Sequence, residues 1–326
     1  MTRIVAIGAG RMGRGIAQVC ASAGYDIALV DFKPRPTDSA GVLLDAARAE
    51  IAGNLDFLSQ LGLLTSAAKD QIIRRIHFVP HADAEDYLRR ADFVFEGVPE
   101  TLAAKQDAFE RLSPLTGPDA VIASTTSTIA VDTLAEFVVR PERFLNAHWL
   151  NPAYLIPLVE VSPGAATAET VVARMMKLLQ EVGKSPVRCK ASPGYIVPRI
   201  QAVAMNEAAR MVEEGVATPE DIDRAIRTGF GIRYATMGLV EFIDWGGVDI
   251  LFYASNYLSE TLQSDHYKTP KIVEDLMAKG ELGLTSGKGF YDLSDTDRDA
   301  YRREKLSTFV ALLRHLDLQP KIIAED

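Results

Sequence analysis

The stretch GAGRMG at residues 8–13 constrains the fold of this chain more than any other feature of the sequence. It follows the apolar run RIVAI and precedes a segment in which apolar residues recur at helical spacing. In this setting Gly8 permits a tight turn, Gly10 lets the phosphates of a ligand approach the backbone, and Gly13 lets the helix pack closely on the strand. The N-terminus of the helix would then offer free N–H groups and its positive dipole end to those phosphates.

An acidic residue follows at the distance that dinucleotide-binding folds require. The second apolar segment, YDIALVD, ends in Asp31, whose carboxylate can accept hydrogen bonds from an adenine ribose. Asp31 would repel a 2′-phosphate, so the sequence predicts NAD as the cofactor, although Lys33 and Arg35 follow closely and weaken this preference. Arg11 and Met12, within the glycine turn, are predicted to line the same site. A glycine-rich turn in an unrelated α/β domain would not account for strand, helix and acid in this order.

Short apolar segments alternate with amphipathic helical segments over residues 1–190. This alternation predicts an α/β fold in which a doubly wound, mostly parallel sheet has helices on both faces. Strands are expected at IVAIG, DIALVD, FVFEGV, AVIAS, FLNAHW and LVEVS. The longer insert at residues 34–75 is predicted to be largely helical.

The sequence changes character at ASPGYIVPRI, after which only helical patterns follow. We therefore place a domain boundary near Ser192, with the sheet domain over residues 1–191 and an all-helical domain over residues 192–326. The last predicted helix has an apolar face that would pack on a partner subunit or remain in solvent, and it is formed by Leu306, Phe309, Val310, Leu313 and Leu316.

Charge and cysteine content exclude several classes of protein. The chain has 326 residues, which suits two domains, and a net charge of −9, which argues against nucleic acid or an anionic membrane as the main partner. Neither a signal peptide nor an apolar run of membrane-spanning length is recognisable. The two cysteines, Cys20 and Cys189, lie outside any metal-ligand spacing, so no metal is expected and a cytoplasmic location is the simplest interpretation.

A histidine and an acid stand out in RFLNAHWLNPAYLIPLVEV, which is typical of two buried strands joined by an Asn-Pro turn. Two such strands can bring His148 and Glu160 side by side. A dehydrogenase without a metal needs a base of near-neutral pKa to take the hydroxyl proton as hydride leaves. His148 could be that base, and Glu160 could fix its tautomer and stabilise the imidazolium. From these residues alone, a purely structural pair is an equal alternative.

The segment STTSTI at residues 124–129 places hydroxyl groups between a predicted strand and a predicted helix. This is the carboxyl end of the sheet, where ligands bind in such folds. Ser127 could donate a hydrogen bond to the reacting oxygen, but Ser and Thr are also preferred helix caps. The spacing does not choose between Ser124, Ser127 and their neighbours.

Taken together, these segments resemble the L-3-hydroxyacyl-CoA dehydrogenase family over almost the whole chain. The matching stretches are GAGRMGRGIAQVCA, FEGVPETLAAK, STTSTI, RFLNAHWLNPAYLIPLVEV, SPGYIVPRI, EEGVATPEDIDRAI and SGKGFYD. The resemblance implies a Rossmann-type NAD-binding domain followed by a helical domain that forms most of a homodimer interface. It also implies roles for single residues: His148 as general base, Glu160 as orienting acid, Ser127 on the substrate oxygen, Glu100 and Lys105 near the nicotinamide ribose, and Asn151 as the asparagine of an H-x-x-N-P motif at the cofactor and substrate.

The chain departs from the family pattern at its substrate end. Pro198 replaces the substrate-binding asparagine of the family motif P-G-F-x-x-N-R, and Gln201 could substitute for it. The insert at residues 41–64 contains a single cation, Arg48, although coenzyme A phosphates require cations. The segment GFGIRYATMGLVEF is similar to the branch that acts on small free hydroxy acids, where Arg233 could bind a carboxylate. A surface arginine is an equal alternative.

The sequence therefore predicts an NAD-dependent oxidoreductase that converts the secondary hydroxyl of a 3-hydroxyacyl compound to a ketone. The substrate would be a coenzyme A thioester such as 3-hydroxybutyryl-CoA, as in fatty acid metabolism, or a free acid resembling gulonate, carnitine or a pyridine carboxylate. A lysine-dependent β-hydroxyacid dehydrogenase is disfavoured because residues 195–215 contain no lysine. A non-catalytic, crystallin-like NAD-binding protein is the remaining alternative.

Overall fold

The structure is a computed structural model that describes residues 2–319. The described residues divide into two compact units, one ending at Met205 and the other beginning at Asn206. This division falls inside helix α8 (Val197–Glu213). The predicted boundary near Ser192 precedes that helix and stays a prediction. Each unit is described below by itself.

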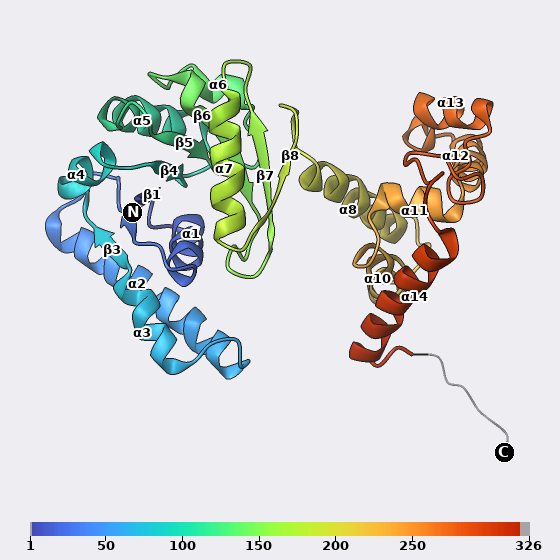
Figure 1. The fold of residues 1–326 in the computed structure, drawn as a ribbon, viewed down its shortest axis with the longest axis horizontal. Helices are drawn as coiled ribbons and strands as arrows, with labels where there is room; N and C mark the ends of the chain where they lie inside the picture. The colour runs from blue at the N-terminus through green and yellow to red at the C-terminus, as the bar shows by residue number, and fades with distance from the viewer. Residues whose placement is uncertain (1, 320–326) are drawn as a thin grey trace. The chain divides into compact units, whose positions relative to one another are not determined.

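The first unit contains an eight-stranded sheet in the order β3-β2-β1-β4-β5-β6-β7-β8 (Figure 1). Its strands are β1 (Ile4–Ile7), β2 (Ile27–Val30), β3 (Ile76–Val79), β4 (Phe93–Glu96), β5 (Val121–Ser124), β6 (Phe144–Trp149), β7 (Leu158–Pro163) and β8 (Ser185–Arg188). All neighbouring strands are parallel except β6 and β7, which are antiparallel. The strand order reverses between β1 and β4, which is where doubly wound folds bind ligands. The prediction of a Rossmann-type sheet domain is confirmed.

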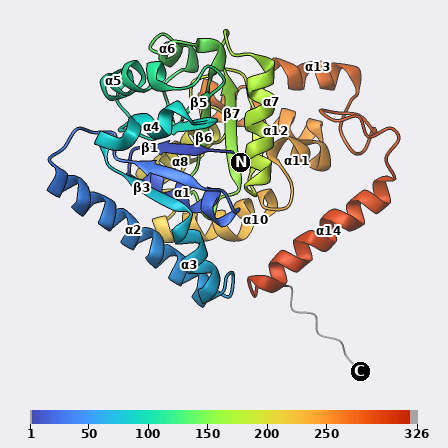
Figure 2. The same ribbon diagram turned by 60° about the vertical axis from the view of Figure 1, so that its left-hand side comes forward.

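Helices cover both faces of this sheet. They are α1 (Arg11–Ser22), α2 (Thr37–Gln60), α3 (Ser66–Arg74), α4 (Ala84–Arg89), α5 (Leu102–Leu112), α6 (Val131–Ala135) and α7 (Glu169–Glu181). One apolar core joins the sheet to α1, α2, α3 and α7, and the other joins it to α4, α5 and α6. Every residue of β1, β2, β4, β5 and β6 is buried, as expected for strands covered on both faces. Helices α2 and α3 lie side by side in both views (Figures 1 and 2).

Two strands were not predicted from the sequence. Strand β3 has only its first and last residues buried, so its four residues carry no clear alternation. Strand β8 lies at the edge of the sheet and contains Pro186, which cannot donate a ladder hydrogen bond and is tolerated at an edge. Both strands are partly exposed, so neither leaves a continuous buried apolar pattern in the sequence.

The second unit is helical within the described residues, as predicted. After the C-terminal half of α8 it contains α9 (Pro219–Ala225), a π-helical turn at Ile226–Phe230, α10 (Gly231–Tyr234), α11 (Leu239–Gly246), α12 (Val248–Thr261), α13 (Lys271–Lys279) and α14 (Arg298–His315). Val248, Val273 and Leu276 form a small buried cluster between α12 and α13. None of the helices among residues 2–319 combines the length and the apolar character that a membrane crossing requires.

The glycine-rich SGKGFYD segment is fastened to α11 by Asp244. The buried Asp244 carboxylate accepts hydrogen bonds from the backbone N–H groups of Phe290 and Tyr291, at 3.0 and 2.8 Å. Further along the chain, α14 contacts α10, and Tyr301 on α14 donates a 2.6 Å hydrogen bond to Glu241. The face predicted to be apolar on this last helix is largely open, with Leu306 and Val310 exposed.

Candidate active site

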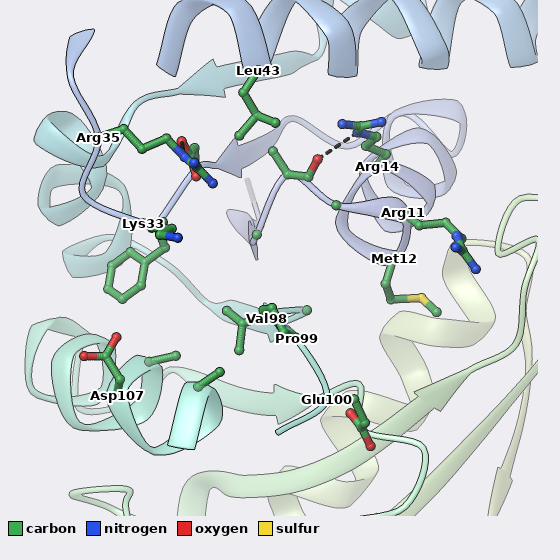
Figure 3. A pocket seen from close by; sticks show the side chains of 18 of the residues that line it. Arg11, Met12, Arg14, Lys33, Arg35, Leu43, Val98, Pro99, Glu100 and Asp107 are labelled. Carbon is green, nitrogen blue, oxygen red and sulfur yellow. Dashed lines mark hydrogen bonds and ion pairs between the residues drawn. The ribbon is translucent and has the colours of Figure 1, made fainter. Parts of the chain in front are cut away.

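A cleft with a volume of about 1070 Å³ opens at the carboxyl ends of β1, β2 and β4 (Figure 3). It is lined by the turn after each of these strands, by one face of α5 and by Asn151. In Figure 3, Lys33 and Arg35 lie at one end of the cleft and Glu100 lies at the other. The predicted residues Gly8, Gly10, Arg11, Met12, Asp31, Glu100 and Asn151 all line it.

The glycine turn has the geometry that a pyrophosphate needs. A Cβ atom on Gly8 would lie 2.8 Å from the carbonyl oxygen of Gly97, and its φ of +95° favours glycine. A Cβ atom on Gly13 would lie only 2.0 Å from the carbonyl oxygen of Gly8, so helix and strand could not pack as they do. A Cβ atom on Gly10 would meet nothing within 4 Å. Gly10 caps α1 without a side-chain hydrogen bond, so the first-turn N–H groups are left for a phosphate, and the turn fits NAD.

At the end of the cleft near Lys33 and Arg35 (Figure 3), an acid is paired with a cation. Asp31 is buried at the end of β2, and its Oδ2 atom accepts a 2.9 Å hydrogen bond from Nε of Arg35. Its other carboxylate oxygen can then serve a ribose hydroxyl. The guanidinium of Arg111 lies 4.5 Å from the ring centre of Phe32 and donates to Asp107 at 2.9 Å, which closes this end of the cleft. Such packing of planar groups suits an adenine ring.

His148 and Glu160 face each other across the antiparallel pair of β6 and β7. Nδ1 of His148 lies 2.8 Å from Oε2 of Glu160, and the two residues are 7% and 0% exposed. A carboxylate can only accept a hydrogen bond, so Nδ1 must carry the proton, and Nε2 is left as the basic nitrogen. The other oxygen of Glu160 accepts the N–H groups of Ile196 and Val197, at 2.9 and 2.8 Å, where α8 begins.

Tyr195 holds the other side of the imidazole. Its ring stacks on that of His148 with centres 5.0 Å apart and planes within 3°. Its hydroxyl donates to the carbonyl oxygen of Thr126 at 2.9 Å and accepts from Nδ2 of Asn146 at 3.0 Å. Tyr195 has a φ of 47°, a left-handed conformation that costs about 1–3 kcal/mol for a residue other than glycine. Tyr195 was not predicted as a site residue, because the sequence marks it only by its position after the Pro-Gly pair.

The hydroxyl turn at residues 126–128 is gathered around Glu100. Oε1 of Glu100 accepts five hydrogen bonds, from the Thr126 hydroxyl at 2.5 Å and from the N–H groups and hydroxyls of Ser127 and Thr128 at 2.9 to 3.2 Å. Partial burial alone would raise the pKa of this carboxyl, but these hydrogen bonds and the ammonium of Lys105 outweigh that effect and lower the pKa to about 2. The Ser127 hydroxyl therefore lies beside the Glu100 anion; Glu100 lines the cleft, whereas Ser127, His148 and Glu160 do not.

Other predicted residues lie elsewhere. Lys105 is fully buried and does not line the cleft, so a direct contact with the cofactor stays a prediction. Gln201 is exposed on α8, and Pro198 is the second residue of that helix. Arg233 lies on α10 in the helical unit, with its guanidinium 5.6 Å from the ring centre of Phe242. Among the described residues, no three His, Cys, Asp or Glu side chains are arranged to hold a metal ion.

Comparison with known proteins places the chain in a family. Two family models match it: the NAD binding domain of 3-hydroxyacyl-CoA dehydrogenase over residues 3–192, and the C-terminal domain over residues 194–293. The chain is 34% identical over 285 residues to a probable 3-hydroxybutyryl-CoA dehydrogenase of Deinococcus radiodurans, which covers 87% of this chain and 98% of that relative. It is 31% identical over 315 residues to the 5-formyl-3-hydroxy-2-methylpyridine 4-carboxylate 5-dehydrogenase of Mesorhizobium japonicum, covering 96% and 98% of the two chains.

A solved structure agrees with these similarities. The 3-hydroxyacyl-CoA dehydrogenase of Archaeoglobus fulgidus matches with a TM-score of 0.79 and 33% identity, over 98% of this chain and 100% of that one. The glycine turn, the strand order and the two family models lead to one conclusion. The chain belongs to the 3-hydroxyacyl-CoA dehydrogenase family, and its N-terminal part is the NAD-binding domain of that family.

Proposed function

We propose that this chain oxidises the 3-hydroxyl group of a 3-hydroxyacyl compound to a ketone with NAD, and that a coenzyme A thioester of the 3-hydroxybutyryl type is its first candidate substrate. The observation that carries the proposal is the 2.8 Å hydrogen bond between Nδ1 of His148 and Glu160, which leaves Nε2 free to act as a base. The family membership and the names of relatives support the substrate class.

The chain's own residues would handle the proton. Nε2 of His148 takes the hydroxyl proton, and the resulting imidazolium is stabilised by the carboxylate of Glu160. Two backbone N–H groups hold the Glu160 carboxylate, and the stacked ring of Tyr195 holds the imidazole, so the hydrogen bond between the two side chains is maintained. The Ser127 hydroxyl, which donates its one proton to Glu100 in the structure, would turn that proton to the reacting oxygen as charge develops on it. NAD bound in the cleft would accept the hydride.

A free hydroxy acid is the second candidate substrate, because the insert at residues 41–64, which the family resemblance places near coenzyme A, contains a single cation, Arg48. Arg48 packs its guanidinium 4.2 Å from the ring centre of Phe78. On α3, Lys69 is paired with Asp56 at 2.5 Å. Phosphates are bound mainly by the charged side chains of Arg and Lys. The pyridine carboxylate dehydrogenase of Mesorhizobium japonicum also aligns over a larger share of this chain than the relative from Deinococcus radiodurans.

A substrate panel tests the proposal. The purified chain is given NAD with 3-hydroxyacyl-CoA thioesters of several lengths, and separately with free hydroxy acids, while NADH absorbance is followed. Turnover of a thioester at a kcat/KM at least tenfold above that of any free acid supports the first candidate, and the reverse order supports the second. If NADH binds but neither class is oxidised, the dehydrogenase proposal is wrong and a non-catalytic NAD-binding protein remains.

A further inference from the structure

Glu96, at the end of β4, is a carboxylate with no solvent exposure and with every oxygen occupied. Oε1 accepts the N–H of Val98 at 2.7 Å, and Oε2 accepts the Ser124 hydroxyl at 2.6 Å. Both oxygens also lie 3.0 Å from Nζ of Lys105, which is equally buried. A carboxylate and an ammonium removed from water at this point need each other, because a lone buried charge is very costly.

Lys105 has a second carboxylate partner. Its Nζ lies 3.4 Å from Oε2 of Glu100, so one ammonium serves two acids. The two carboxylate oxygens of Glu100 therefore have different partners. Oε2 faces Lys105, whereas Oε1 receives all five hydrogen bonds from the turn at residues 126–128. Glu100 also lines the cofactor cleft.

The same turn is connected to the imidazole. The carbonyl oxygen of Thr126 accepts the hydroxyl of Tyr195, whose ring stacks on His148. A continuous series of short contacts thus runs from Glu96 through Lys105 and Glu100 to the hydroxyl turn, and from there to Tyr195. Its members come from β4, the turn between β4 and α5, α5 itself, the turn after β5 and the segment before α8.

We propose that Glu96 and Lys105 are positioning residues. Glu96 fixes the ammonium of Lys105, and Lys105 fixes Glu100. The hydroxyl turn thereby keeps its place beside Glu100, at the end of the cleft where the nicotinamide would bind. The alternative is that the buried pair only stabilises the fold. For the role of Ser127 the inference rests on the proposed function, but for cofactor binding it does not. NADH binding, measured without substrate, therefore tests it independently of what the substrate is.

The main experiment removes both buried charges together. In the double variant Glu96→Gln and Lys105→Met no unpaired buried charge remains, so stability should stay near that of the wild type. Glu100 would nevertheless lose its cation, and NADH should bind about tenfold more weakly, as expected when a hydrogen bond to a charged group is lost. Thermal unfolding and NADH fluorescence titration give the two readouts. A stable double variant that binds NADH within twofold of the wild type overturns the proposal.

A matched control carries the same change of charge on the surface. Glu85 and Arg89 form an exposed i,i+4 pair on α4, outside the cleft lining. The double variant Glu85→Gln and Arg89→Met should leave NADH affinity unchanged. Loss of affinity in this control would attribute the effect to charge in general and would contradict the proposal.

A variant at Glu100 keeps the proposal testable if the main variant is unstable. Glu100→Gln changes a partly exposed side chain and leaves the buried pair intact, so that variant should fold, and NADH binding within twofold of the wild type in this variant would contradict the proposal. If Lys105 acts through Glu100, adding Glu96→Gln and Lys105→Met together to Glu100→Gln should weaken NADH binding no further. Two losses that multiply would show independent effects and would contradict the proposal. Loss of the cation should also raise the pKa of Glu100, so in the double variant Glu96→Gln and Lys105→Met the acid limb of NADH binding should move to higher pH.

Discussion

Glu160 supports two structures at once, because one oxygen binds His148 while the other binds two N–H groups at the start of α8. A glutamine at this position cannot satisfy both sides. If its amide NH₂ turns toward His148, the imidazole must accept at Nδ1 and carry its proton on Nε2, where it can no longer act as the base. If the amide turns the other way, its NH₂ group faces the N–H groups of Ile196 and Val197, and two donors cannot form a hydrogen bond.

We therefore expect Glu160→Gln to lower kcat by about 10²–10⁴ and to lower the free energy of unfolding by about 1–3 kcal/mol. Steady-state kinetics and urea unfolding measure the two effects. Glu169→Gln, which alters an exposed ion pair with Arg188, is the control and should change neither quantity appreciably. A Glu160→Gln enzyme with a kcat within threefold of the wild type would contradict the assigned role.

We predict that the preference for NAD over NADP depends on Asp31 and Arg35. While Asp31 is present, its carboxylate holds Arg35 and repels a 2′-phosphate. In Asp31→Ser the guanidinium of Arg35 is released and can bind that phosphate, so the ratio of kcat/KM for NADP to that for NAD should rise by about 10–100-fold. Adding Arg35→Ala to Asp31→Ser should remove most of this increase in the NADP-to-NAD ratio. An unchanged ratio in Asp31→Ser would show that the discrimination lies elsewhere.

Glu100 makes stability depend on pH in an acidic range. Its pKa is lowered from 4.5 to about 2 in the folded chain, so the ionised carboxylate stabilises the fold. This contribution is complete above pH 4.5 and is lost as the pH falls toward about 2. The difference in the free energy of unfolding between wild type and Glu100→Gln should shrink over that interval. The control is Glu110→Gln on α5, which should show a smaller change. A difference that does not vary between pH 6 and 2.5 would contradict this account.

At the level of elements, the parts that could be predicted are those fixed by nearby residues. The glycine turn and Asp31 belong to one strand–helix–strand segment, and the register of β6 on β7 follows from a short connection that leaves little choice of pairing. The contacts of Glu96 with Ser124 and of Tyr195 with Thr126 could not be predicted, because they join residues that are distant in sequence. Strands β3 and β8 could not be predicted from the sequence, because neither buries a continuous apolar run.

Two helical glycines with opposite surroundings test how α1 packs. A Cβ atom on Gly13 would lie 2.0 Å from the Gly8 carbonyl oxygen, whereas one on Gly53, within α2, would meet nothing within 4 Å. Gly13→Ala should therefore lower the free energy of unfolding by about 1–3 kcal/mol and weaken NADH binding. Gly53→Ala should raise it by about 0.5–1 kcal/mol with no effect on NADH. Urea unfolding and fluorescence titration measure both, and equal effects of the two substitutions would contradict this packing.

At the level of the whole molecule, the two units differ in how much apolar surface they bury. The sheet unit has two cores, whereas α12 leaves Ile250, Tyr253 and Tyr257 more than 60% exposed. Exposed apolar patches of this kind are typical of protein interfaces. The predicted homodimer through the helical domain would cover such a patch, and it stays a prediction, as does the cytoplasmic location.

The account as a whole depends on a neutral imidazole taking a proton from an alcohol. The most direct test is the rate of hydride transfer in a single turnover, measured by stopped flow for the wild type and for His148→Gln with the best substrate of the panel. The rate should fall by about 10²–10⁴-fold while the dissociation constant for NADH stays within about twofold. A variant that transfers hydride at the wild-type rate would contradict the assignment of His148 as the base.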